Sequence, residues 1–170
     1  MSDAPVPGHA SDPSPVLVEV FSAIQRERMH DVPILNPALS VEAVGFEEYQ
    51  GNWIGVLVTP WFMNLVALPG SGAWRSAPER ASVYYAFPTG IYEFIAGLEP
   101  GIGEYHACSL FSPMPEFADQ VAARETARAA RAALFDPQLL GEGREPAPPE
   151  AAPPTLSRRE LLRGGRPPEP

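Results

Sequence analysis

The sequence predicts an α+β fold: an antiparallel sheet of about five or six strands, flanked by an N-terminal and a C-terminal helix, with disordered Pro-rich tails. Three observations predict it. All sixteen aromatic residues lie between Phe21 and Phe135, while thirteen of the 22 Pro residues lie in residues 1–15 and 137–170. Apolar residues recur at helical spacing near both ends of the aromatic-rich segment. Between these ends, strand-like runs are joined by turns too short for a crossover helix, which indicates antiparallel pairing.

The first helix is expected from Pro15 to about Met29. Ser14 and Pro15 have the form of an N-cap followed by Pro at the first helical position. Apolar side chains then recur at the spacing of one helix face, at Leu17, Val20, Phe21 and Ile24. Two Pro residues at positions 33 and 37 end this helix, because Pro disfavours helical backbone at the residue before it.

Six apolar runs follow, and each has the length of a strand. They occupy residues 41–46, 53–59, 62–68, 81–87, 91–98 and 104–111. Turn-forming residues separate several of them, at Gln50-Gly51, at Pro88-Thr89-Gly90 and at residues 100–103. We therefore expect consecutive hairpins.

Residues 116–135 are rich in Ala and Arg and are expected to form the second helix. Its expected packing stripe consists of Phe117, Val121, Ala129, Ala130, Ala133 and Leu134. After this helix no apolar period remains. The expected organisation is a disordered leader (1–14), a single α+β domain (15–136), a Pro/Ala/Glu-rich linker (137–154) and a basic tail (155–170).

The expected domain is acidic. The formal net charge of the chain is −9, and residues 16–136 contain fourteen Asp and Glu against seven Arg. This argues against nonspecific binding to a phosphate backbone, which needs clustered cations. Residues 1–15 carry no secretory signal, and the most apolar stretch, residues 53–68, is too short to cross a bilayer. We expect a cytoplasmic protein with no nucleic-acid partner and no stable membrane insertion.

Few residues could carry metal or catalytic chemistry. Cys108 is the only cysteine, so an intrachain disulfide and a Cys-rich metal site are excluded within one chain. His106 lies two residues before Cys108 on an expected strand, and the two share a face. Together with His30 and Asp31 they would supply four ligands for a soft divalent metal. The alternative is structural: a His at a helix end, a buried His and a buried Cys.

These residues form no catalytic constellation that the sequence makes recognisable. We therefore expect a protein that is not an enzyme and that needs no cofactor. The alternative function is a small metal-handling accessory protein.

Two features of the domain are candidates for partner binding. Arg124, Arg128 and Arg131 are neighbours along one face of the second helix, where they form either a solvated face or a dock for an acidic surface. Aromatic residues near strand ends include Trp61 and Tyr92. They either fill the core or line a groove for an extended peptide on a sheet face without a helix.

The basic tail contains the run SRRELLRGG, whose paired basic residues are Arg158 and Arg159. The run has the pattern of a twin-arginine export motif, but no apolar segment follows it, so we do not expect it to direct export. It is either a chance basic patch or a short recognition segment. A Pro-rich linker of this length can hold it roughly 40 Å from the domain.

Five segments together resemble, in order and spacing, the HybE/HupJ family of nickel–iron hydrogenase assembly chaperones. They are Arg28-Met29-His30-Asp31, Val58-Thr59-Pro60-Trp61, Leu68-Pro69-Gly70, residues 88–94 (PTGIYEF) and residues 108–113 (CSLFSP). The resemblance covers roughly residues 16–136 and the SRRELLRGG run. It implies a noncatalytic cytoplasmic chaperone for maturation of an uptake or membrane-bound hydrogenase. Its partner would be a small or large subunit precursor before assembly and twin-arginine export, with the precursor's signal peptide as a candidate contact.

The matching segments also suggest binding residues, namely His30, Asp31, Trp61, Cys108, Arg158 and Arg159. An acidic domain would attract the paired arginines of a signal peptide. The chain's own paired arginines then have two alternative roles. They occupy the signal-peptide site when no client is present, or they bind the client directly.

Overall fold

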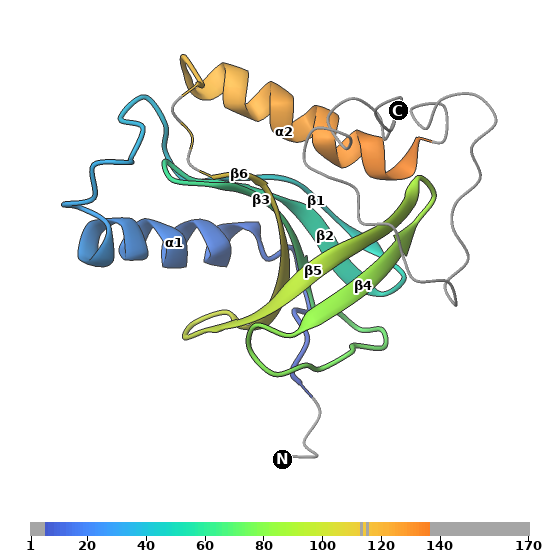
Figure 1. Cartoon of the computed structure of the whole chain (residues 1–170). Helices are drawn as coiled ribbons and strands as arrows, with labels where there is room; N and C mark the ends of the chain where they lie inside the picture. Colours follow the sequence, from blue (N-terminus) through green and yellow to red (C-terminus); the bar gives the residue numbers. More distant parts are fainter. Residues whose placement is uncertain (1–5, 113, 115, 137–170) are drawn as a thin grey trace.

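The structure, a computed structural model, describes residues 6–112, 114 and 116–136. Two helices and six strands make up this part of the chain, as the sequence predicts (Figure 1). Their bounds are α1 Ser14–Arg28, β1 Glu42–Tyr49, β2 Asn52–Val58, β3 Met63–Leu68, β4 Ser82–Phe87, β5 Gly90–Glu99, β6 Gly103–Phe111 and α2 Gln120–Phe135. The fold class is therefore confirmed.

The six strands form one antiparallel sheet in the order β1-β2-β3-β6-β5-β4. Strands β1 to β3 form one meander and β4 to β6 another, and the two meanders join where β3 pairs with β6. This order places β1 and β4 at the two edges. The sheet curves strongly, so that the β4–β5 hairpin turns away from the plane of β1 and β2 (Figure 1).

The turn between β1 and β2 is a tight two-residue hairpin. Gln50 and Gly51 both have left-handed backbone, with φ of 53° and 82°. Two successive residues with positive φ are what a type I′ turn requires, and this turn matches the right-handed twist of the flanking strands. Tyr49 and Asn52 are consequently paired across the hairpin, and both residues line a cavity beside it.

The helices cover opposite faces of the sheet and define two hydrophobic clusters (Figure 1). On one face, Leu17 and Phe21 of α1 pack against residues that include Leu57 and Val66. On the other face, the small side chains of α2 pack against the inner side of the curved sheet. The inner cluster contains Val44, Ile54, Val56, Leu65, Phe87, Tyr92, Phe94 and Leu110.

The start of α1 differs in detail from the expectation. The helix begins at Ser14 itself, and its N-cap residue, Pro13, makes no side-chain capping hydrogen bond. Asp12 Oδ1 instead accepts hydrogen bonds from the backbone N–H and the hydroxyl of Ser14, at 2.9 and 2.6 Å. Part of the expected leader packs on the domain. The backbone of His9 donates to the Pro69 carbonyl at 2.8 Å and accepts from Trp53 Nε1 at 2.9 Å.

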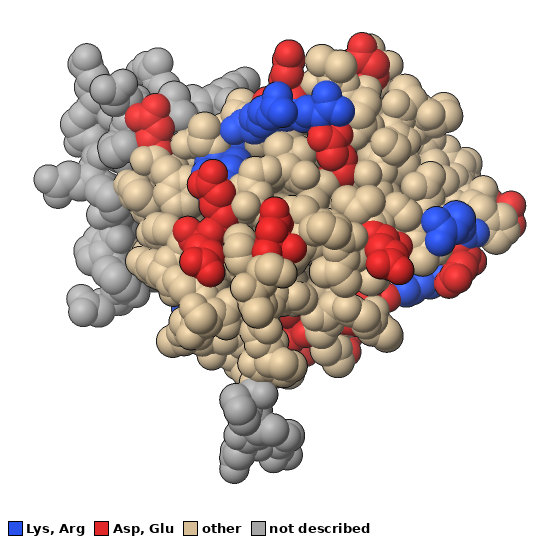
Figure 2. All heavy atoms as spheres, turned by 180° about the vertical axis from the view of Figure 1, so that it is seen from behind, with Lys and Arg blue, Asp and Glu red and all other residues tan. Residues whose placement is uncertain are grey.

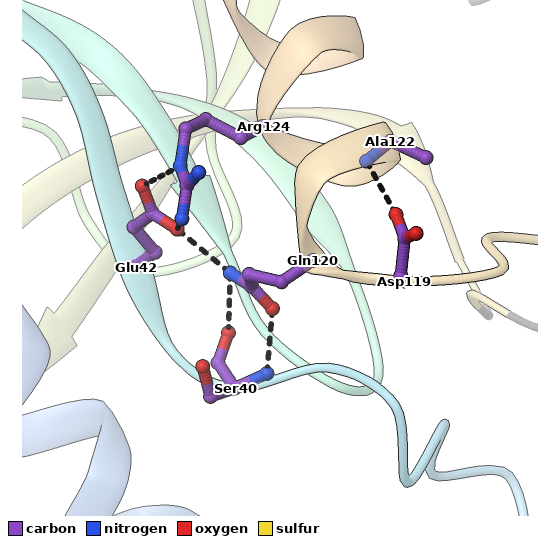
Figure 3. A network of polar contacts seen from close by, with 6 residues as sticks. All are labelled: Ser40, Glu42, Asp119, Gln120, Ala122 and Arg124. Atoms are coloured by element: carbon purple, nitrogen blue, oxygen red, sulfur yellow. Dashed lines mark hydrogen bonds and ion pairs between the residues drawn. The ribbon is translucent and has the colours of Figure 1, made fainter.

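The packing stripe of α2 also differs from the expectation. The buried residues are Ala123, Ala127, Ala130, Ala133 and Leu134, whereas Val121 is 53% exposed and Ala129 is exposed. The helix begins at Gln120 because Asp119 caps it, accepting from the Ala122 N–H at 2.8 Å (Figure 3). Alanines on the inner face let the helix approach the sheet closely, and this geometric advantage outweighs the greater hydrophobicity of Val121. In the described residues no helix is long and apolar enough to cross a membrane.

Candidate functional site

Of the three arginines that lie along α2, Arg124 and Arg128 are in different environments. Arg124 forms a bidentate ion pair with Glu42 of β1, with Nε–Oε2 and Nη2–Oε1 distances of 2.6 and 3.0 Å (Figure 3). Gln120 also donates to Glu42 Oε1, at 2.8 Å, and accepts from the Ser40 N–H. Arg128 is exposed.

The third arginine reaches the bulge in β1. The register of β1 shifts between Val44 and Glu47, and Gly45 there has φ of 66°. Arg131 Nε donates to the carbonyl of Gly45, and its Nη2 lies 2.8 Å from Glu47 Oε2. A Cβ atom at Gly45 would lie 2.7 Å from Arg131 Cδ, so a side chain here would have to displace Arg131 and would also be strained by the positive φ. Arg124 and Arg131 thus bind the β1 edge of the same chain, and Figure 2 shows arginines lying beside acidic side chains.

These contacts shift the pKa of Glu42. Burial raises it, but the hydrogen bonds from Arg124 and Gln120 and the charges of Arg124 and Arg128 outweigh burial, so the pKa is lowered from its ordinary value. Glu42 is therefore ionised when it binds α2.

Both aromatic candidates belong to the core. Trp61 is 9% exposed and packs in the cluster under α1. Tyr92 is 1% exposed and lies in the inner cluster, where its hydroxyl is 2.6 Å from Thr89 Oγ1. Neither ring presents a surface in this structure.

The four candidate metal ligands are not brought together. His30 Nε2 lies 3.0 Å from Asp31 Oδ2, and both side chains are exposed. His106 is fully buried on β6, and Cys108 lies partly buried on the same strand. Within residues 6–112, 114 and 116–136, no three His, Cys, Asp or Glu side chains gather so that they could hold a metal ion. Arg158 and Arg159 lie outside the described residues.

The sequence did not predict the polar cluster around His106. The Tyr85 hydroxyl contacts His106 Nδ1 at 2.5 Å, and the Trp74 ring stacks on the imidazole with centroids 4.2 Å apart. Burial raises the pKa of Tyr85, with smaller opposing contributions, so its hydroxyl keeps its proton, and the tautomer of His106 decides which of the two groups donates. On the other side of the ring, His106 Nε2 faces Glu104 Oε1 at 3.6 Å, which is longer than a hydrogen bond.

The loop between β3 and β4 covers this cluster. Glu104 binds the loop through the Ser76 hydroxyl and the Ala77 N–H, each at 2.8 Å. At the other end of the loop, Asn52 Nδ2 donates to the Ala73 carbonyl at 2.7 Å. Trp74 was the one large apolar side chain in an otherwise small or polar loop, and such an isolated aromatic is the signal that could have indicated burial there.

A cavity of about 420 Å³ lies beside this loop. We call it the cleft. Its walls are the β1–β2 hairpin (Tyr49, Gln50, Asn52, Ile54), the loop (Ala73, Arg75) and β4 (residues 84–86). On one side the Tyr49 hydroxyl, 3.5 Å from the Ala86 carbonyl, bridges the two edge strands. The cleft can therefore accept a ligand with apolar and hydrogen-bonding groups, next to one cation.

Comparisons with known proteins agree with the resemblance found in the sequence. The family model for NiFe-hydrogenase assembly, chaperone, HybE matches residues 12–164. The chain is 44% identical over 149 residues to the hydrogenase expression/formation protein HupJ of Bradyrhizobium diazoefficiens, covering 88% of this chain and 86% of that protein. It is 45% identical over 127 residues, 74% of this chain, to a Rhodobacter capsulatus protein named "Probable rubredoxin HupJ", and spans 46% of its length.

The solution structure of HybE from Escherichia coli has the same fold. It superposes with a TM-score of 0.64 at 25% identity, covering 79% of this chain and 83% of that one. The family model and the HupJ relative each cover most of the chain. The chain therefore belongs to the HybE family of nickel–iron hydrogenase assembly chaperones.

Proposed function

We propose that this protein binds a precursor subunit of a nickel–iron hydrogenase in the cytoplasm and holds it before assembly and twin-arginine export, without catalysing a reaction. The observation that carries the proposal is the family match over residues 12–164, because that family is one of assembly chaperones. The proposal goes further than the family by naming the bound form of the client and the step at which it is held.

Charge supports contact with the signal peptide. Residues 16–136 carry twice as many acidic as basic residues. Two of the arginines of α2 are paired within the chain, while the carboxylate of Glu47 is mostly exposed although it contacts Arg131. Figure 2 shows acidic side chains spread over the visible face. Such a surface attracts a peptide with paired arginines and accelerates the encounter.

The direct test is a titration of the purified full chain with three probes: the small-subunit precursor, the same subunit without its signal peptide, and the large-subunit precursor. We expect at least one precursor to bind. If the signal peptide contributes, its removal weakens binding. Raising the salt concentration then weakens binding of the intact precursor more than binding of the truncated subunit. Absence of binding to all three would overturn the proposal.

The basic tail has two alternative roles in this scheme. If Arg158 and Arg159 occupy the signal-peptide site in the free protein, deleting residues 155–170 tightens binding of a twin-arginine peptide. If they bind the client, Arg158→Ala combined with Arg159→Ala weakens capture of the precursor. Arg163→Ala with Arg166→Ala is the matched control, since it removes the same charge outside the paired motif.

A further inference from the structure

The outer edge of β4 is open. No described strand pairs with that side of β4. Phe87 and Gly90 close a two-residue hairpin, and such a closing pair exchanges its backbone hydrogen bonds. Backbone hydrogen bonding to the partner strand alternates from one residue to the next in an antiparallel pair. Val83 and Tyr85 therefore also bond to β5, whereas Ser82 and Tyr84 direct their N–H and C=O groups toward the open edge.

A side-chain hydrogen bond from the other edge strand also shows which backbone groups of β4 point outward. Ala86 belongs to the outward-directed set, and its carbonyl accepts from the Tyr49 hydroxyl across the gap between the two edge strands. Further along the edge, the cleft lies beside Tyr84, between β4 and the β1–β2 hairpin. An added strand would therefore run along the outer side of β4 and place side chains in the cleft.

Apolar side chains are exposed at the same place. Three of the five large hydrophobic residues that are exposed in the described part of the chain lie on β4 and β5: Tyr84 at 40%, Ile95 at 42% and Leu98 at 57%. Ser82 pairs with Ile95 and Tyr84 with Glu93, so Tyr84 and Ile95 are diagonal neighbours on one face. Exposed apolar groups beside an open strand edge are typical of surfaces that bind another chain.

The cleft also indicates the charge of its ligand. Arg75 is the charged residue among those that line it, and its guanidinium lies 4.7 Å from the Tyr85 ring centroid. Among the described side chains, no carboxylate lies within ion-pairing distance of Arg75. A carboxylate on the ligand would complement this cation. The paired arginines of a twin-arginine peptide do not supply such a group.

We propose that the β4 edge and the cleft bind an extended segment of the hydrogenase precursor as an added strand, with an acidic side chain at Arg75 and apolar side chains over Tyr84 and Ile95. This inference rests on the proposed function and adds the surface that performs it. The segment differs in charge from the signal peptide, so the two contacts involve different parts of the precursor.

The first test compares two substitutions at one residue of the full chain, using the precursor that binds in the titration above. Tyr84→Pro removes an outward N–H without removing a bond to β5, whereas Tyr84→Ala removes the same ring and keeps the N–H. One backbone hydrogen bond corresponds to about tenfold in affinity, so we expect Tyr84→Pro to bind about tenfold more weakly than Tyr84→Ala. Equal affinities would overturn the added strand.

Charge is tested separately, with substitutions at two arginines that lie outside β4. Arg75→Glu should weaken precursor binding about tenfold, because it replaces an attraction with a repulsion. Arg80→Glu is the matched control, since Arg80 is exposed and does not line the cleft. Equal effects of the two substitutions would overturn the assignment of the cleft.

Amide exchange gives a readout that needs no substitution. Saturation with precursor should slow exchange of the Ser82 and Tyr84 amides more than that of Val83 and Tyr85, which already bond to β5. Unchanged exchange would overturn the inference. Concentration-dependent protection of the same amides without precursor would overturn it in favour of pairing between two copies. If no precursor binds the wild-type chain, the proposed function fails; if it binds and the edge variants bind equally well, only this inference fails.

Discussion

Thr89 donates two hydrogen bonds to a single acceptor, the carbonyl oxygen of Leu134 near the end of α2. The backbone N–H lies 3.3 Å and the hydroxyl 3.0 Å from that oxygen. The hydroxyl proton of Thr89 is donated to the Leu134 carbonyl. The Tyr92 hydroxyl, 2.6 Å away, therefore donates to Thr89 Oγ1. The Pro88-Thr89-Gly90 turn, one of the segments that resemble the HybE family, thus joins the β4–β5 hairpin to α2.

Thr89→Val should lower the free energy of unfolding by about 1–3 kcal/mol, because it removes a buried hydroxyl and leaves Tyr92 without this acceptor. Denaturant unfolding measures the change. The matched control is Thr126→Val, because the Thr126 hydroxyl bonds only to Ala122 of its own helix turn, at 3.0 Å, and should matter less. A loss for Thr89→Val no greater than for the control would contradict this role.

Ala129 and Ala130 are adjacent in α2 but differ in burial. Ala130 is fully buried against the sheet, whereas Ala129 is exposed. Ala130→Leu should therefore cost about 1–3 kcal/mol of stability by overpacking. Ala129→Leu should change stability by no more than about 0.5 kcal/mol. Thermal and denaturant unfolding of the two variants provide the comparison, and similar losses would show that the helix packs on a different face.

The ion pair between Glu42 and Arg124 makes part of the stability depend on pH. The pKa of Glu42 is lowered in the folded protein from its ordinary value of 4.5, so the unfolded state binds more protons in the window below that value. The stability that the charged carboxylate contributes is complete above pH 4.5 and is lost as the pH falls toward the folded pKa. The advantage of the wild type over Glu42→Gln should shrink in that window. A difference independent of pH would disprove this assignment.

His106 gives a second pH window. Burial lowers its pKa from the ordinary 6.5, and the charge of Arg75 lowers it further, while Glu104 opposes both. The unfolded state therefore takes up a proton before the folded state does. Stability should fall as the pH drops below 6.5, until the folded pKa is reached. In unfolding experiments at several pH values, His106→Gln should remove this part of the slope; an unchanged slope would rule His106 out as its source.

Local patterns in the sequence predicted much of the fold. Helical spacing around Leu17 and Phe21 and the Gln50-Gly51 turn signal depend on neighbouring residues, and the structure has both elements. The buried face of α2 was predicted less well. Hydrophobicity favours burial of Val121, whereas the short distance between the helix and the sheet favours small side chains at the interface.

The site was less predictable, because it depends on contacts between distant segments. His106 was singled out for its spacing from Cys108. Of its partners, Glu104 lies on the same strand, but Tyr85 comes from β4 and Trp74 from the loop between β3 and β4. The row of arginines was visible in the sequence, but their pairing with Glu42 and Glu47 was not, because it requires the register of β1 against α2.

The strand order has a consequence for how the chain folds. Residues 42–68 and 82–111 each form a meander whose pairings are local in sequence, whereas Leu65 meets Cys108 only where β3 joins β6. Closing the longer loop costs more conformational entropy, so local hairpins form first and the junction forms late. Leu65→Ala, at this junction, should therefore act mainly by accelerating unfolding, with little effect on the folding rate. A folding rate that slowed as much as unfolding accelerated would place the junction in the nucleus instead.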